Sequence, residues 1–164
     1  MLDHATIAER VAYGSPLPGV PDDTIRVAPR PTTALIGRIL IAAIFVVSGL
    51  AKLVNTDQTA EHMAGVGIPA PHFLAVVAGL VEILGALAIG LGFLTRVGAL
   101  ALIAFMIPAT LLFHNFWVYD GAEQKTQMIN FLKNLTTIGG LCMLFAYGAG
   151  RYSIDARLRR PMQP

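Results

Sequence analysis

Charged side chains are scarce in this 164-residue chain: they make up 13% of it, against about 25% in soluble domains. Hydrophobic residues make up 55%, and the mean hydropathy is +0.64. The net charge is only +2, and no run of basic residues alternates with aromatic ones, so nothing indicates a nucleic-acid surface. The composition predicts an integral membrane protein with one compact domain and the lipid bilayer as its first partner.

Cysteine is almost absent as well. Cys142 is the single one, which excludes an intrachain disulfide and a dithiol redox pair. Because it lies within an apolar run, we expect Cys142 to be a small buried core residue. Metal-ligand patterns are also missing: His62, His72 and His114 show no ligand-like spacing, and we expect no metal site.

Long apolar runs are what the chain has instead. A helix of about 20 apolar residues spans the hydrocarbon core of a bilayer, and four runs reach that length, so we predict an all-α, integral membrane four-helix bundle. The predicted spans are about 33–53, 73–95, 97–116 and 131–150. Polar stretches at 54–72 and 114–130 connect them, with a short interfacial helix expected over 57–64. Arg96 is expected to form almost the whole of a tight turn between the second and third spans.

Basic residues predict the orientation of the bundle. Arginines are concentrated in the two terminal segments and at Arg96, whereas the other side holds only Lys52, Lys125 and Lys133. The positive-inside rule then places both termini in the cytoplasm. We expect a flexible cytoplasmic tail over 1–31, a transmembrane domain over 32–157 and a basic tail over 158–164.

The second span contains a single charge, Glu82. An ionised carboxylate that faced lipid near the middle of a span would cost about 2.5 kcal/mol or more, so Glu82 should face other helices. Small residues at spacings of three and four share its helix face, the pattern that lets helix backbones approach closely in membranes. They are Ala75, Gly79, Ala86 and Gly90.

Three bases compete as partners of Glu82. Lys52 and Lys133 lie about 10 Å from it along the bundle axis on one side, and Arg38 lies a similar distance away on the other. We expect Arg38 or Lys133 to pair with Glu82, because Lys52 is more simply read as a side chain that snorkels to the interface. Arg38 and Lys52 share one face of the first helix.

A candidate site lies where polar residues gather at the outer ends of the spans. A carboxylate, lysines and a histidine around an apolar cavity suit a quinone or similar carbonyl compound and the transfer of protons. The candidate catalytic residues are Glu82, His114 and Lys133. The candidate binding residues are Arg38, Lys52, Asn115, Trp117 and Asn134. An equally weighted alternative is structural, in which Glu82 neutralises a base and locks the bundle.

Two further interpretations concern Trp117 and the histidines. Trp117 by default is an anchor at the level of the lipid headgroups. A haem held by His72 and His114 is disfavoured, because no histidine pair is buried within two facing spans.

Several segments together resemble the DoxX family of small bacterial membrane proteins. They are GRILIAAIFVVSGLAKL (37–53), GIPAPHFLAVVAGLVEILGALAIGLGFLTR (67–96), HNFW (114–117), NFLKN (130–134), GG (139–140) and GAGRYSID (148–155). The resemblance covers roughly 33–157 and implies a four-helix inner-membrane protein. Some members of the family are linked to thiosulfate:quinone oxidoreductase, and others to membrane complexes that handle thiol and oxidative stress. The family's characteristic polar and glycine positions match Arg38, Gly49, Lys52, Glu82, Arg96, His114, Lys133 and Asn134.

From the residues and the resemblance together we predict a multi-pass protein of the bacterial inner (plasma) membrane. It would act as a quinone-associated or redox-accessory subunit, that is, as an oxidoreductase subunit if it is catalytic. Its protein partner would be a redox enzyme or a second copy of the chain. The alternatives are a non-catalytic scaffold that assembles a partner enzyme, and a small-molecule carrier, which four spans without broken-helix pairs disfavour.

Overall fold

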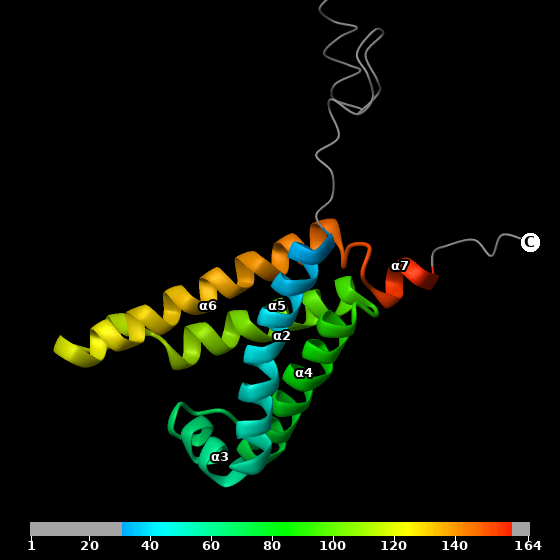
Figure 1. The fold of residues 1–164 in the computed structure, drawn as a ribbon. Coiled ribbons are helices and arrows are strands. Elements are labelled where there is room, and N and C mark those ends of the chain that lie inside the picture. Colours follow the sequence, from blue (N-terminus) through cyan, green and yellow to red (C-terminus); the bar gives the residue numbers. More distant parts are fainter. Residues whose placement is uncertain (1–30, 159–164) are drawn as a thin grey trace, which may run out of the picture. The chain divides into compact units, whose positions relative to one another are not determined.

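The computed structural model describes residues 31–158, and all regular structure in that part of the chain is helical (Figure 1). Four of its helices are long and apolar enough to cross a membrane. They are α2 (Pro31–Val54), α4 (Pro71–Leu91), α5 (Thr95–Phe113) and α6 (Gly121–Tyr147). The predicted all-α membrane fold is thereby confirmed. The tails expected at 1–31 and 158–164 lie almost entirely outside the described residues.

Three short helices complete this part of the chain. α3 (Thr56–Gly65) follows α2 and corresponds to the short helix expected over 57–64, η2 (Phe116–Val118) follows α5, and α7 (Ile154–Leu158) follows α6. α3 packs Ala60 and Met63 against Ala75 and Ala78 of α4, which buries the apolar side of an otherwise polar helix. We call the end of the bundle at α3 and η2 the α3 end, and the opposite end the α7 end.

The closest helix pair is α2 and α4, which cross at two glycines. A Cβ atom on Gly49 would lie 2.8 Å from the carbonyl oxygen of Gly79, and one on Gly79 would lie 2.7 Å from Leu53. Only glycine therefore fits at this crossing. The expected small-residue face of α4 is confirmed, since Ala75, Gly79 and Ala86 are buried on the same side as Glu82.

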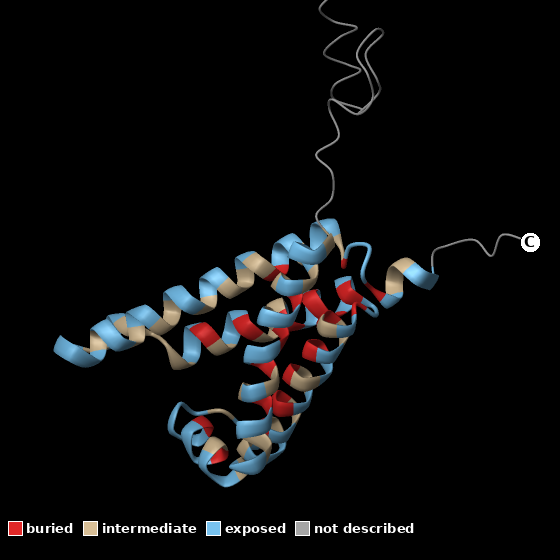
Figure 2. Cartoon of the chain, viewed as in Figure 1, coloured by how far each residue is buried: buried red, intermediate tan, exposed pale blue. Residues whose placement is uncertain are grey.

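α5 packs between α4 and α6 and brings Leu102 into the core beside Ile89 and Leu141. α6 lies along α5 and buries only Leu141, so most of its length is exposed (Figure 2). The expectation that Cys142 is buried is wrong, because Cys142 is exposed. Its neighbour Leu141 is the buried residue of α6, and the next residue points about 100° away around the helix.

Two boundaries differ from the sequence-based expectation. α6 begins at Gly121 rather than near 131, because 122–125 (AEQK) are good helix formers, whereas hydropathy locates only the apolar part of a helix. The turn between α4 and α5 is made by 92–94, with left-handed backbone at Gly92 (φ 69°) and Leu94 (φ 51°). Arg96 belongs to the first turn of α5 and donates a hydrogen bond to the carbonyl oxygen of Ala146, so it does not form the turn.

The segment after α6 folds back over this turn. The carboxylate of Asp155 accepts hydrogen bonds from the backbone N–H groups of Leu94 and Thr95, at 2.9 and 3.1 Å. These are N–H groups that the start of a helix leaves without partners, so Asp155 stabilises the beginning of α5 from a distant part of the sequence.

Candidate functional site

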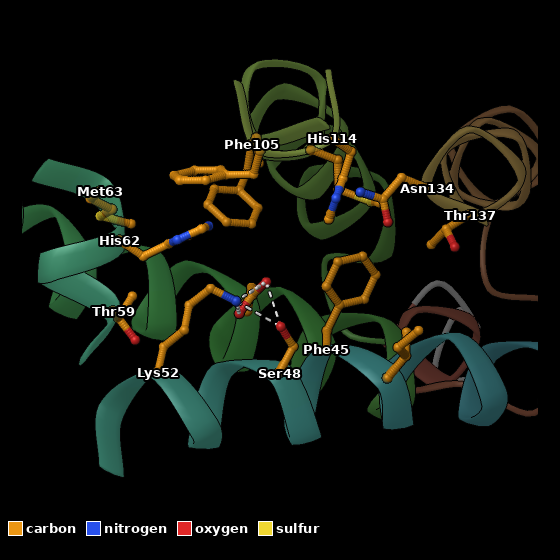
Figure 3. A pocket seen from close by; sticks show the side chains of 15 residues that line it. Phe45, Ser48, Lys52, Thr59, His62, Met63, Phe105, His114, Asn134 and Thr137 are labelled. Atoms are coloured by element: carbon orange, nitrogen blue, oxygen red, sulfur yellow. Dashed lines mark hydrogen bonds and ion pairs between the residues drawn. The ribbon is translucent and has the colours of Figure 1, made fainter. Parts of the chain in front are cut away.

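A pocket of about 340 Å³ lies toward the α3 end, and all four long helices and α3 contribute to its lining (Figure 3). That volume is within the range of small-molecule sites, about 300–1,000 Å³. Its apolar lining consists of Ile44, Phe45, Met63, Phe105, Met106, Ala109 and Phe113. Its polar lining consists of Ser48, Lys52, Thr59, His62, Glu82, His114, Asn134 and Thr137.

An ion pair between α2 and α4 forms the polar centre of the pocket. Lys52 Nζ lies 2.9 and 3.0 Å from the two carboxylate oxygens of Glu82. Ser48 joins the two groups: its hydroxyl accepts a hydrogen bond from Lys52 at 2.7 Å and donates one to Glu82 at 3.0 Å. The Glu82 side chain is 5% exposed and that of Lys52 is 25% exposed. Glu82 is therefore satisfied inside the bundle, while the ammonium group remains accessible from the pocket.

The expected partners of Glu82 were wrong, as was the expectation that Lys52 snorkels. The glycine crossing explains why Lys52 is the partner of Glu82, because Gly49 and Gly79 each lie three residues before one member of the pair. Close approach at the crossing brings the next helical turn of α2 against that of α4. Lys52 lies on the face of α2 that packs against α4, so its side chain reaches Glu82 directly.

Arg38 lies at the other end of α2, away from the pocket. It is fully buried (1% exposed) and donates hydrogen bonds to the carbonyl oxygens of Ala149 at 2.6 Å and Tyr152 at 2.7 Å. The guanidinium group therefore anchors the segment after α6. It neither pairs with Glu82 nor lines the pocket. Arg38 therefore has a structural position and lies outside the site to which it was predicted to belong.

His114 and Asn134 do line the pocket, and both connect α5 to α6. His114 Nδ1 lies 2.9 Å from the side-chain oxygen of Gln127, and the Asn134 amide donates a hydrogen bond to the Thr110 hydroxyl at 3.1 Å. With Lys52 and Glu82, the structure brings together four of the eight residues that the sequence predicted for the site.

Three further candidates lie elsewhere. Lys133 is exposed on α6, because its neighbour Asn134 takes the position that faces the pocket and adjacent helical residues point about 100° apart. Trp117 is 54% exposed and packs edge-on against Phe131, with 6.1 Å between ring centroids. Asn115 is half-buried before η2 and does not line the pocket.

Sequence reasoning missed Ser48 and His62 as pocket residues. Ser48 lies four residues before Lys52 and so shares its helix face. This spacing could have indicated Ser48, but the residue lies within an apolar stretch of the sequence. His62 lies beside buried Met63 on α3 and stacks on Phe113, with ring centroids 5.1 Å apart and an interplanar angle of 23°. His72, the other half of the disfavoured haem pair, is a surface residue whose Nε2 lies 3.5 Å from a carboxylate oxygen of Asp57.

Comparison with known proteins agrees with this architecture. The chain is 35% identical to the inner membrane protein YphA of Escherichia coli over 79% of this chain and 93% of that one. It is 36% identical to the inner membrane protein YqjF of the same organism over 77% and 92%, and 30% identical to the membrane protein Rv3486 of Mycobacterium tuberculosis over 79% and 83%. No solved structure matches the chain. The DoxX family model matches residues 33–115, and the chain therefore belongs to the DoxX family.

Proposed function

We propose that the pocket binds the head of a quinone, or of a carbonyl compound of similar shape, and that the chain serves a redox enzyme as a quinone-associated accessory subunit. The protein is a multi-pass inner-membrane protein. The single observation that carries the proposal is an ion pair between buried Glu82 and partly accessible Lys52 that faces the pocket within membrane-spanning helices. Ionisable groups at such depth are costly and usually functional.

The lining suits a flat ring that bears carbonyl oxygens. Phe45, Phe105 and Phe113 provide aromatic surface, against which a planar ring packs in an offset or edge-to-face arrangement. The Asn134 amide on α6 has a second N–H group beside the one that it donates to Thr110. Lys52 on α2 would donate to a ligand by exchanging one of its three hydrogen bonds to Glu82 and Ser48. A quinone offers one carbonyl acceptor on each side of its ring, so the two donors match the chemistry of its head.

The Lys52–Glu82–Ser48 cluster supports a role in proton transfer. Reduction of a quinone to a quinol consumes two electrons and two protons. The electrons would come from a redox enzyme, which is why we propose an accessory subunit. The protons would pass through groups that can bind and release them beside the ring, and a lysine and a carboxylate joined by a hydroxyl form such a relay.

We propose that the α3 end, with the pocket, faces the periplasm and that both termini are cytoplasmic. Among residues 31–158, Arg38, Arg96, Arg151 and Arg157 lie toward the α7 end, and the basic residues toward the α3 end are Lys52, Lys125 and Lys133. This asymmetry matches the positive-inside rule.

A second candidate role is that of a scaffold for a partner enzyme, and α6 supports it. Only 6% of the residues in the most apolar stretch of this helix are buried, compared with 39% for α4. A helix that packs so little within its own chain has a long face available to another protein. Purification in mild detergent separates the two roles: a stoichiometric protein without quinone would favour the scaffold.

The test of the first role is the quinone content of the purified protein. Wild type, Glu82→Gln and Glu123→Gln are purified in mild detergent, and bound quinone is extracted and quantified by mass spectrometry. Glu123 is an exposed carboxylate near the start of α6, so its change is the matched control. We expect quinone with wild type and Glu123→Gln and several-fold less with Glu82→Gln. No quinone with any of them, or equal amounts with all, would contradict the proposal.

A further inference from the structure

We propose that the pocket opens sideways to the bilayer between α2 and α6, and that its ligand bears a hydrocarbon chain that leaves through this opening. The inference rests on the proposed binding of a quinone-type head. It adds the class of ligand, a chain-bearing molecule dissolved in the membrane, and the route by which that ligand enters.

α3 covers part of the α3 end of the pocket. α3 contributes Thr59, His62 and Met63 to the lining, and the ring of His62 stacks on Phe113 at the end of α5. This contact joins α3 to α5 across the mouth that would otherwise face the water phase. Figure 3 shows His62 and Met63 on one side of the pocket and His114 and Asn134 on the other.

Most of the other sides are sealed by close helix contacts. The glycine crossing at Gly49 and Gly79 leaves no space between α2 and α4. Leu102 fills the position opposite Gly85 between α4 and α5. The hydrogen bond from Asn134 to Thr110 joins α5 to α6 along the pocket. Among the four long helices this leaves the side between α2 and α6.

α2 and α6 make few contacts, and these two helices approach each other at Ile41 and Gly140. A Cβ atom on Gly140 would lie 3.1 Å from the end of the Ile41 side chain. One turn closer to the α3 end, Ile44 on α2 and Thr137 on α6 both line the pocket. Ile44 is at the same time 57% exposed, whereas its pocket-lining neighbour Phe45 is 4% exposed, and we infer that part of the Ile44 side chain faces outward. The same side chain therefore borders both the pocket and the surrounding lipid.

The depth of this opening determines what passes through it. Ile44 lies near the middle of α2 (Pro31–Val54), at a level that the hydrocarbon core surrounds when the helix spans a bilayer. Lys52 lies eight residues further along, which is about 12 Å along the helix axis. A ligand whose polar head reaches Lys52 would therefore place an apolar chain at Ile44.

The test compares two quinones that share a head: one without a chain and one with a decyl chain. Equilibrium affinities are measured for the wild-type protein, Ile44→Trp and Leu40→Trp in lipid nanodiscs. Tryptophan at Ile44 would fill the opening with an apolar side chain that lipid tolerates. Leu40 is 67% exposed on the same helix and does not line the pocket, so Leu40→Trp is the matched control.

We expect wild type to bind the decyl quinone about tenfold more tightly than the chain-free head. Ile44→Trp should remove that advantage, and Leu40→Trp, which lies outside the pocket, should change neither affinity. Wild type that binds both quinones equally, or Ile44→Trp that binds the decyl quinone as wild type does, would overturn the sideways opening alone. Wild type that binds neither quinone would contradict the proposed function as well.

A second measurement does not depend on the folding of a variant. A quinone with a photoreactive group at the end of its chain is cross-linked to the wild-type protein, and the labelled peptides are identified. Label on α2 and α6 around Ile44 and Thr137 is the expected result. Label on α3 around Thr59 and His62 would mean that the chain leaves toward the water phase, and would overturn the proposal.

Discussion

At the scale of single residues, the Lys52–Glu82 pair places a carboxylate inside the bundle, where burial of a charge is costly. Glu82 is almost completely buried, and Lys52 is accessible on the pocket side. A buried charge without its partner is strongly destabilising, while the loss of both members together is tolerated far better. The pair therefore has a structural role whatever its role in proton transfer.

Glu82→Gln should lower the stability of the purified protein. Gln keeps the shape but leaves the Lys52 ammonium group without its counter-charge, and we expect a loss of about 1–3 kcal/mol, less than for a fully enclosed pair because Lys52 is partly accessible. Thermal unfolding in detergent measures it, with Glu123→Gln as the control. Adding Lys52→Met should recover part of the loss. Strictly additive effects of the two changes would show that the residues are not coupled.

A second residue, Arg38, acts at the α7 end. Arg38→Met would remove the hydrogen bonds to Ala149 and Tyr152 and leave the carbonyl groups of the buried Ala149 and the exposed Tyr152 without these donors. We expect the free energy of unfolding to fall by about 1–3 kcal/mol. This change should lower the melting temperature and speed up proteolysis after Tyr147. Arg151→Met removes an exposed arginine of the same segment and should change neither. Equal protease sensitivity of the two variants would contradict the anchoring role.

At the scale of helices, the site depends on how closely α2 approaches α4. The glycines lie one turn from the ion pair, and a side chain at either one would push the helices apart. The geometry of the pair is thus set by residues that contribute no charge to it.

Gly49→Ala should widen this crossing. The new methyl group would meet the backbone oxygen of Gly79 at 2.8 Å, which cannot move without the helix, and we expect a loss of about 1–3 kcal/mol by overpacking. Gly37→Ala is the control on the same helix, since a Cβ atom there meets nothing within 4 Å, and it should be neutral or slightly stabilising. Thermal unfolding of both variants measures the difference. A Gly49→Ala protein as stable as Gly37→Ala would refute the close crossing.

The helices also show what the sequence could and could not predict. Apolar length revealed the four spans, and the spacing of small residues revealed the buried face of α4. The start of α6 was missed because 121–130 are polar and only their helix propensity indicates a helix. The partner of Glu82 was missed because axial distance alone cannot separate Lys52 from Lys133. That choice depends on rotation about α6, on which Asn134 rather than Lys133 faces the pocket.

At the scale of the whole molecule, the described part of the chain has two chemically different ends. The α7 end holds arginines and the folded-back segment, and the α3 end holds the pocket. The proposed orientation predicts that a reporter fused after Pro164 is active only if it functions in the cytoplasm. A reporter fused to a chain truncated after Asp120, before α6 begins, should be active only if it functions in the periplasm. The opposite pattern would reverse the orientation and place the pocket on the cytoplasmic side.

The proposed function depends on whether a quinone head binds at Lys52. The most direct measurement is the equilibrium affinity of a decyl quinone for wild type, Lys52→Met and Lys133→Met, at a temperature where all three are folded. Lys133 is an exposed lysine of α6 outside the pocket, so the two variants lose the same charge in different places. We predict that Lys52→Met binds about tenfold or more weakly, because a charge-assisted hydrogen bond is lost, and that Lys133→Met binds as wild type does. Equal affinity of all three proteins would contradict the account.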